Sequence, residues 1–345
     1  MKIVAALFGV VIATLLTVAM LFTAGWVHPP ILSTQAGFRG LALNQLTTPA
    51  AKAKLELANA LPAAIEEGPP DGPKASEVYQ NVQVLKDLSA VQFNTLMAAI
   101  TTWVAPDQGC NYCHNPDNLA DDGKYTKKVA RRMIQMVQHV NTDYKAHVAN
   151  TGVVCWTCHR GNPIPKYTWT NGEGYPQATG GFATTNRGMG HPSWANGSTA
   201  LLQDPYGPLD SQASVVNVRV QPTRALPLNS NGPSYQDAEN TYSLMIAMSK
   251  GLGVNCTFCH NSRAFWSWEE SLPQRVTAWH GMQMARDLNV SYLDPLKDLL
   301  PAERLGKLGD APKANCMTCH QGANKPLLGV SLAKDWPALG GTAAK

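Results

Sequence analysis

Four copies of the pattern Cys-x-x-Cys-His carry the chemistry of this sequence. They use all eight cysteines and place a histidine directly after every second cysteine. This is the attachment pattern of c-type haem, in which the two thiols form thioethers and the adjacent histidine binds the iron. A zinc site or a set of disulfides would leave the four histidines unexplained. The pattern predicts four covalently bound haem c groups, at Cys110, Cys113 and His114; at Cys155, Cys158 and His159; at Cys256, Cys259 and His260; and at Cys316, Cys319 and His320.

The haem assignment also bears on disulfides, location and charge. No cysteine is left over for a disulfide, and c-type haem is attached after export, so we expect the protein outside the cytoplasm. The formal charge is +4, but four haems bring propionates worth roughly −8 when ionised at an ordinary carboxylate pKa. The finished protein is then acidic, and no nucleic-acid partner is expected.

Each iron also needs a second axial ligand or an open position, which separates an electron carrier from a catalyst. Met97 and Met245 lie shortly before the first and third motifs, and Met133 lies before Cys155. A methionine on an apolar helix face ordinarily serves packing. The repeated placement before three motifs instead favours iron ligation, with Met136 as a competitor of Met133.

The fourth haem breaks this rule. Met97 and Met245 are 148 positions apart, and the same offset from Met133 leads to Gly281, which cannot bind iron. His147 faces the same side of its predicted helix as Met133, about four turns further on. The sequence therefore predicts His147 as the distal ligand of the fourth haem. The other candidates are Met282, Met284 and His280.

The elements that must position these residues are mainly helical. Apolar spacing predicts helices over about 89–103, 126–150, 239–249 and 271–292, with Ser89 capping the first. The shared 148-residue offset indicates two duplicated halves, each of helix, haem, helix and haem, joined by long irregular connections with a short hairpin at 215–220. The expected organisation is an anchor (1–27), an extended arm (28–75), a first dihaem half (76–160), an irregular connection (161–233) and a second dihaem half with its tail (234–345).

The N-terminal segment is apolar and long. Residues 3–27 carry no charge and would span about 37 Å as a helix, enough to cross a bilayer. A cleaved signal peptide is the alternative, with a cut site at 23–25, but its apolar region is typically shorter. We expect a retained transmembrane helix, with Lys2 on the cytoplasmic side and the remaining chain in the periplasm.

Over about 76–336, the chain resembles the tetrahaem cytochrome c subunit of the photosynthetic reaction centre of purple-type bacteria. The resemblance rests on the four motifs, the Met and His spacings, and the stretches that begin at Cys256 and Cys316. In that family three haems have His/Met ligands and the fourth has two histidines. The matching positions here are Met97, Met133, Met245 and His147. Many members carry a lipid-anchoring cysteine after the signal segment, whereas this chain has none and a retained helix replaces it.

The resemblance implies an electron-transfer subunit rather than an enzyme. Such a subunit re-reduces the photo-oxidised bacteriochlorophyll pair held by the L and M subunits, with the haem of the third motif nearest the pair. A soluble cytochrome c or a high-potential iron–sulfur protein refills the relay from the periplasm. Arg263 and Arg275 are candidates for raising the potential of the third haem. The alternatives are a membrane-anchored tetrahaem quinol dehydrogenase and a multihaem reductase, which would need an open iron.

Overall fold

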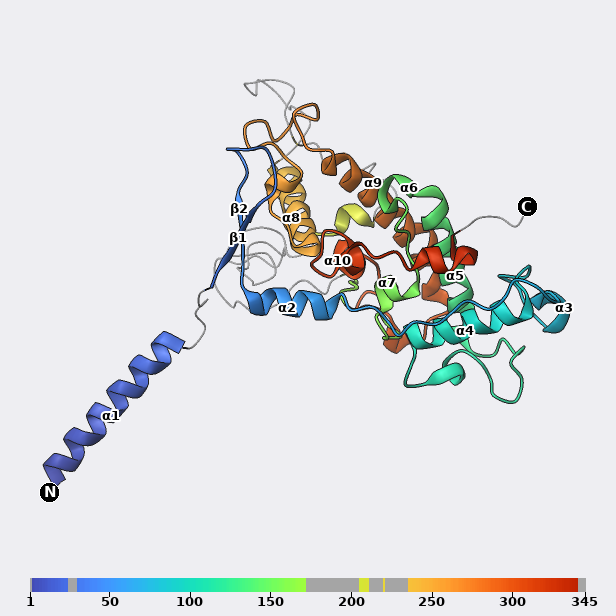
Figure 1. Ribbon diagram of the computed structural model, residues 1–345, viewed down its shortest axis with the longest axis horizontal. Coiled ribbons are helices and arrows are strands. Elements are labelled where there is room, and N and C mark those ends of the chain that lie inside the picture. Colours follow the sequence, from blue (N-terminus) through green and yellow to red (C-terminus); the bar gives the residue numbers. More distant parts are fainter. Residues whose placement is uncertain (1, 24–29, 172–204, 211–219, 221–234, 341–345) are drawn as a thin grey trace.

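A computed structural model describes residues 2–23, 30–171, 205–210, 220 and 235–340, and these residues are mainly helical. Figure 1 shows α4 and α5 on one side, α8 on the other, and the short helices α7 and α10 between them. The hairpin predicted at 215–220 lies outside the described residues apart from residue 220. The helices that matter for the site are α4 (Ala90–Val104), α5 (Tyr125–Asp143), α6 (Lys145–Val148), α7 (Cys155–His159), α8 (Tyr235–Leu252), α9 (Gln274–Asp287) and α10 (Cys316–His320).

The N-terminal helix α1 (Lys2–Thr23) has the length and composition of a membrane span. Residues Ile3–Thr23 have a mean hydropathy of 2.6, and the helix contacts none of the protein core. A helix of this kind near the N-terminus fits both a membrane anchor and a signal sequence. The structure is thus compatible with the anchoring that the sequence predicts.

The predicted cap of α4 is confirmed, α8 extends beyond the predicted range 239–249 at both ends, and the other two long helices change where they were expected to continue. Ser89 caps α4, since its Oγ accepts a hydrogen bond from Gln92 N at 3.1 Å. The helix predicted over 126–150 is interrupted at Tyr144, where the backbone leaves helical geometry before α6 begins. The helix predicted over 271–292 begins after Pro273 as α9 and then widens into the π-helix η4 (Leu288–Leu293).

The arm between the anchor and the first half carries secondary structure that its Pro-, Ala- and Gly-rich composition did not predict. A two-stranded antiparallel hairpin pairs β1 (Leu32–Gln35) with β2 (Asn44–Thr47), with Leu32 opposite Thr47. The helix α2 (Pro49–Ala58) follows, capped by Thr48, and the single turn α3 (Ala75–Val78) precedes α4. The arm is therefore a structured part of the protein.

The remaining elements are short 3-10 turns. They are η1 (Gly109–Tyr112), η2 (Gly207–Leu209), η3 (Cys256–Phe258), η5 (Asp294–Asp298), η6 (Ala302–Arg304), η7 (Pro326–Gly329), η8 (Ala333–Asp335) and η9 (Pro337–Leu339).

Two hydrophobic clusters form the core, and each includes the first cysteine of a haem motif. The first joins α4, α5 and α7 with the end of the chain, where Trp103 and Trp336 meet edge to face with ring centroids 5.3 Å apart. Its buried members are Leu96, Ala99, Trp103, Ile134, Val137, Val154, Cys155, Trp336 and Leu339. The second joins α8 and α9 with η2, and its buried members are Leu209, Leu244, Met248 and Ala285, with Cys316 packed against them.

Each cluster contains a residue from a segment that lies far from it in the sequence. Leu339, which follows the fourth motif, completes the first cluster, and Leu209, which follows the second motif, completes the second. Two buried asparagines hold these segments. Asn141 of α5 donates to Leu339 O at 2.7 Å, and Asn289 of η4 donates to Leu209 O at 3.2 Å. Neither cluster is complete without residues that lie far from it in the sequence.

Candidate haem-binding sites

The four motifs adopt two local conformations. The second and fourth form the single-turn helices α7 and α10, and the next residues, Arg160 and Gln321, have left-handed φ angles of 49° and 48°. The first and third lie on the 3-10 turns η1 and η3. In each motif the histidine therefore follows its cysteine pair within one helical turn.

All four motif histidines have the same ring orientation relative to the backbone. In each of them Nδ1 lies 2.8–3.0 Å from a main-chain carbonyl oxygen, which can only accept a hydrogen bond. Nδ1 therefore carries the proton, and Nε2 is left as the metal-binding nitrogen. The pairs are His114 with Leu119, His159 with Asn162, His260 with Phe265, and His320 with Ala323.

Burial favours the neutral, metal-binding form of three of these imidazoles. It lowers the pKa of His159 and of His260, and it lowers the pKa of His320 to about 4, against an opposing hydrogen bond from Nδ1 to a carbonyl. A histidine must be neutral to bind a metal, so these groups are ready ligands at neutral pH.

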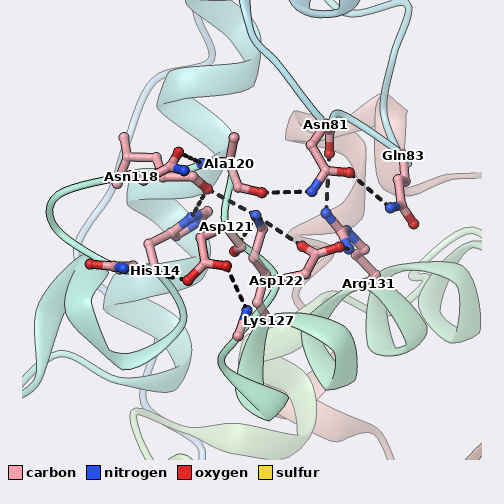
Figure 2. Close-up of polar contacts among 12 residues, drawn as sticks. Asn81, Gln83, His114, Asn118, Ala120, Asp121, Asp122, Lys127 and Arg131 are labelled. Carbon is pink, nitrogen blue, oxygen red and sulfur yellow. Dashed lines mark hydrogen bonds and ion pairs between the residues drawn. The ribbon is translucent and has the colours of Figure 1, made fainter.

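The loop after the first motif is held by a polar network that Figure 2 shows. Lys127 Nζ donates to Leu119 O at 2.9 Å, the same carbonyl that faces His114 Nδ1. Asp122 pairs with Arg131 at 2.8 Å and with Lys127 at 3.1 Å. The ion pairs on α5 therefore fix the carbonyl that orients His114.

His147 is a further histidine whose ring is held in the same way as those of the four motif histidines. Its Nδ1 lies 2.9 Å from Thr277 O of α9, which again leaves Nε2 free, and burial lowers its pKa. Its ring lies edge-on to that of His320, with the ring planes 63° apart and the centroids 6.0 Å apart. A metal held between two imidazoles needs about 2 Å for each metal–nitrogen bond, and the two ring radii bring the total to about the observed separation. The residues thus fit a bis-histidine iron at the fourth motif.

The three predicted methionine ligands are half-buried on helices that pack against haem motifs. Met97 lies on α4, which contacts both η1 and α7, and Met133 lies on α5, which contacts α7. Met245, predicted for the third haem, lies on α8, which contacts α10 of the fourth motif. Met97 packs against the first hydrophobic cluster and Met245 against the second. Their positions leave them as candidate ligands.

His139 is engaged elsewhere. Its Nδ1 lies 2.6 Å from Asp143 and its Nε2 lies 2.6 Å from Asp287 of α9, so both ring nitrogens are occupied by carboxylates. The ring also stacks on Tyr292. This histidine therefore joins α5 to the second half of the chain. Met282, an alternative ligand, packs against the second cluster.

One pair of cysteines departs from the expectation that no disulfide forms. Cys158 and Cys319 are joined in the structure, with Cα atoms 4.5 Å apart, whereas the other six cysteines are free thiols. The second cysteines of the second and fourth motifs therefore lie back to back. A sulfur that forms a disulfide cannot also form a thioether, so the two states exclude one another.

Several positioning residues were not found by sequence reasoning. Asn141 and Asn289 hold the backbone two residues before the second and fourth motifs, at Val153 and Ala314. Thr257 binds the arm, as described below. The 148-residue offset links Asn141 to Asn289 and was visible in the sequence, but it gave no indication of their partners.

Comparison with known proteins identifies the family. The model of the photosynthetic reaction centre cytochrome c subunit matches residues 27–340. The chain belongs to this family. It is 47% identical over 328 residues to the photosynthetic reaction center cytochrome c subunit of Thermochromatium tepidum, covering 95% of this chain and 80% of that protein. It is 46% identical to that of Rubrivivax gelatinosus, covering 94% and 88%, and 43% identical to that of Roseobacter denitrificans, covering 78% and 74%.

Membership of this family confirms the electron-transfer class. Reaction centre cytochromes carry electrons and are not enzymes, so the predicted role is confirmed and the respiratory quinol dehydrogenase is not favoured. Covalently bound haem c follows from the same family.

Proposed function

We propose that this chain holds four haem c groups through its eight motif cysteines and passes electrons to a photo-oxidised bacteriochlorophyll pair on the L and M subunits. The proximal ligands are His114, His159, His260 and His320, and the distal ligands are Met97, Met133, Met245 and His147. The haems supply the one-electron chemistry, and the protein sets their order and potentials. The haem domain lies in the periplasm and receives electrons from a soluble cytochrome c or a high-potential iron–sulfur protein.

One observation carries the orientation of this subunit: the arm is fastened to the third motif. Thr257, inside that motif, accepts a hydrogen bond from Leu43 N at 2.9 Å, and its hydroxyl lies 3.1 Å from Ala36 O. Ser262 donates to Leu41 O at 2.9 Å. The anchor ends at Thr23, so Ala36 is at most about 45 Å of extended chain from the membrane. This tether supports the placement of the third motif on the membrane side of the subunit, next to the pigment pair.

The packing of the motifs supports a relay in the order three, four, two, one. Gly251, at the end of α8, accepts a hydrogen bond from Gly322 N at 2.8 Å, just beyond the fourth motif. The fourth motif meets the second at Cys158 and Cys319, and the second shares α4 with the first. The membrane-distal end of such a relay is the first motif, where a soluble donor has access.

We also infer that the two halves arose by duplication. Asn141 and Asn289, 148 positions apart, make the same contacts to the backbone before a motif. His139 bonds to Asp287 at the same separation, so equivalent positions of α5 and α9 meet face to face. This pairing is what a two-fold relation between duplicated helices would produce.

Flash-induced absorbance on native membranes tests the proposal. After a saturating flash, the pigment pair should be re-reduced as a c-type haem is oxidised, and the cytochrome should co-purify with bacteriochlorophyll. Intact-mass analysis should give the chain plus four haems, which requires thioethers at Cys158 and Cys319. A pigment-free soluble cytochrome, or a flash that leaves the haems reduced, would refute the proposal.

A further inference from the structure

Arg160 carries a positive charge that no carboxylate neutralises within the described part of the chain. It follows the iron-binding histidine of the second motif, and its side chain is half-buried. Its guanidinium donates to uncharged oxygens of the described residues. Two of these are the carbonyls of Thr157 at 3.1 Å and Ala58 at 3.3 Å. The other two are Asn59 Oδ1 at 3.4 Å and the carbonyl of Cys319 at 3.3 Å. The salt bridges of the described residues do not include it.

The guanidinium lies between two haem motifs. Thr157 belongs to the second motif and Cys319 to the fourth, and Arg160 reaches the carbonyls of both. The arm holds it there from a third side, through the end of α2 at Ala58 and Asn59. A side chain bound at three points by different segments has a fixed position, so its charge acts on both motifs from a constant distance.

The fourth motif offers the matched comparison. Gln321 occupies the position equivalent to Arg160, directly after the motif histidine and with the same left-handed backbone. It is buried and uncharged. Two otherwise similar motifs therefore differ by one unit of charge at the same place, and that charge is directed toward the interface between them.

We infer that Arg160 sets the reduction potentials of the haems at the second and fourth motifs, holding both above the values that a neutral residue would give. Reduction of a haem adds an electron, and a nearby positive charge stabilises the reduced form. The effect is large when the charge has no counter-ion and is partly shielded from water. An arginine guanidinium is always protonated at neutral pH, so Arg160 keeps its positive charge. The inference rests on the proposed attachment of haem at these motifs.

A redox titration of the purified haem-loaded protein, followed in the haem α-band, tests the inference. Arg160→Gln places at the second motif the residue that the fourth already has. Two of the four midpoint potentials should fall, while the potentials of the haems at the first and third motifs should stay close to wild type. Arg160→Lys keeps the positive charge, so its two affected potentials should stay close to those of wild type. Lys52→Gln removes a positive charge from the exposed side of α2 and should move none of the four.

Two outcomes would overturn the inference. One is an Arg160→Gln protein whose four potentials match those of wild type, and the other is an equal fall with Lys52→Gln or Arg160→Lys. The haem content per chain and the far-ultraviolet circular dichroism of each variant show whether it is folded and fully loaded. A wild-type protein with fewer than four haems contradicts the proposed function, whereas unshifted potentials in a fully loaded Arg160→Gln protein contradict only the inference about Arg160.

Discussion

Gly281 of α9 faces the imidazole of His147. A Cβ atom at position 281 would lie 2.5 Å from His147 Cε1 and 2.8 Å from Nδ1, closer than side-chain atoms approach one another in proteins. The glycine therefore leaves the space that the ring fills as it passes α9 toward His320. This gives a physical reason for a glycine where the equivalent residue of α5 is Met133. The residue that cannot bind the iron makes room for the one that we propose as its ligand.

Gly281→Ala should displace His147 from the fourth motif. The added methyl overpacks the contact at a cost of about 1–3 kcal/mol, and a shift of the His147 ring to relieve it changes its position relative to His320. We expect the low-temperature EPR signal of the bis-histidine haem to weaken or change its g-values. Gly207→Ala is the matched control, because a Cβ at Gly207 meets no atom within 4 Å. An unchanged signal in Gly281→Ala would show that this contact does not position the ligand.

His147→Met should raise the potential of one haem and leave the other three nearly unchanged. A thioether ligand favours the reduced iron more than an imidazole does. The only bis-histidine EPR signal should disappear at the same time. His280→Met is the comparison, since His280 interacts with His147 and is the alternative histidine for this iron. If the signal survives in His147→Met and is lost in His280→Met, the ligand assignment is wrong.

Asp122→Asn should destabilise the protein most above about pH 4, and the loss should shrink gradually as the pH falls from there toward the lowered pKa of the native carboxyl. A hydrogen bond from Arg131, with others from Asn81 and Lys127, holds the pKa of Asp122 well below its usual range. A carboxyl group with a lowered pKa contributes stability above its unfolded pKa of about 4, and this contribution is lost as the pH falls further.

Urea unfolding at pH 7 and pH 3 checks this expectation. The Asp122 side chain is 33% exposed, so we expect a loss of only about 1 kcal/mol at pH 7. Asp87→Asn breaks an ion pair that is more than half exposed on both sides and should have a smaller effect. A loss for Asp122→Asn that is equal at both pH values would rule out the ionised carboxylate as its source.

Thr257→Val should loosen the arm from the third motif. The substitution keeps the shape and removes the hydroxyl, which leaves Leu43 N without its acceptor at a cost of about 1–3 kcal/mol. Arg39 lies in the segment that is freed, so trypsin should cut there faster and separate the anchor from the haem domain. Electron transfer after a flash should also slow. Thr95→Val, whose hydroxyl bonds only within α4, should leave both rates unchanged.

The sequence by itself determined the chemistry of this protein, because haem attachment is encoded locally. Five consecutive residues specify each site, and a short turn is enough to present both thiols and the histidine. The long helices were also predictable, since their apolar spacing and the Ser89 cap act within a few residues. The interruption at Tyr144 and the π-helix after Asp287 were not, and both lie where Tyr144 and Asp287 form a hydrogen bond across the two halves of the chain.

Only the tertiary structure decided which distant segments meet. No periodicity indicates that Thr257 binds a loop more than two hundred residues earlier. Nor does it indicate that Leu339 packs into the first cluster and Leu209 into the second. The charge of Arg160 was visible in the sequence, but its lack of a counter-ion was not. Such contacts depend on how the helices pack against one another. Packing selects partners by shape and by the need to satisfy buried hydrogen-bonding groups. The spacing of residues along one segment indicates neither of these.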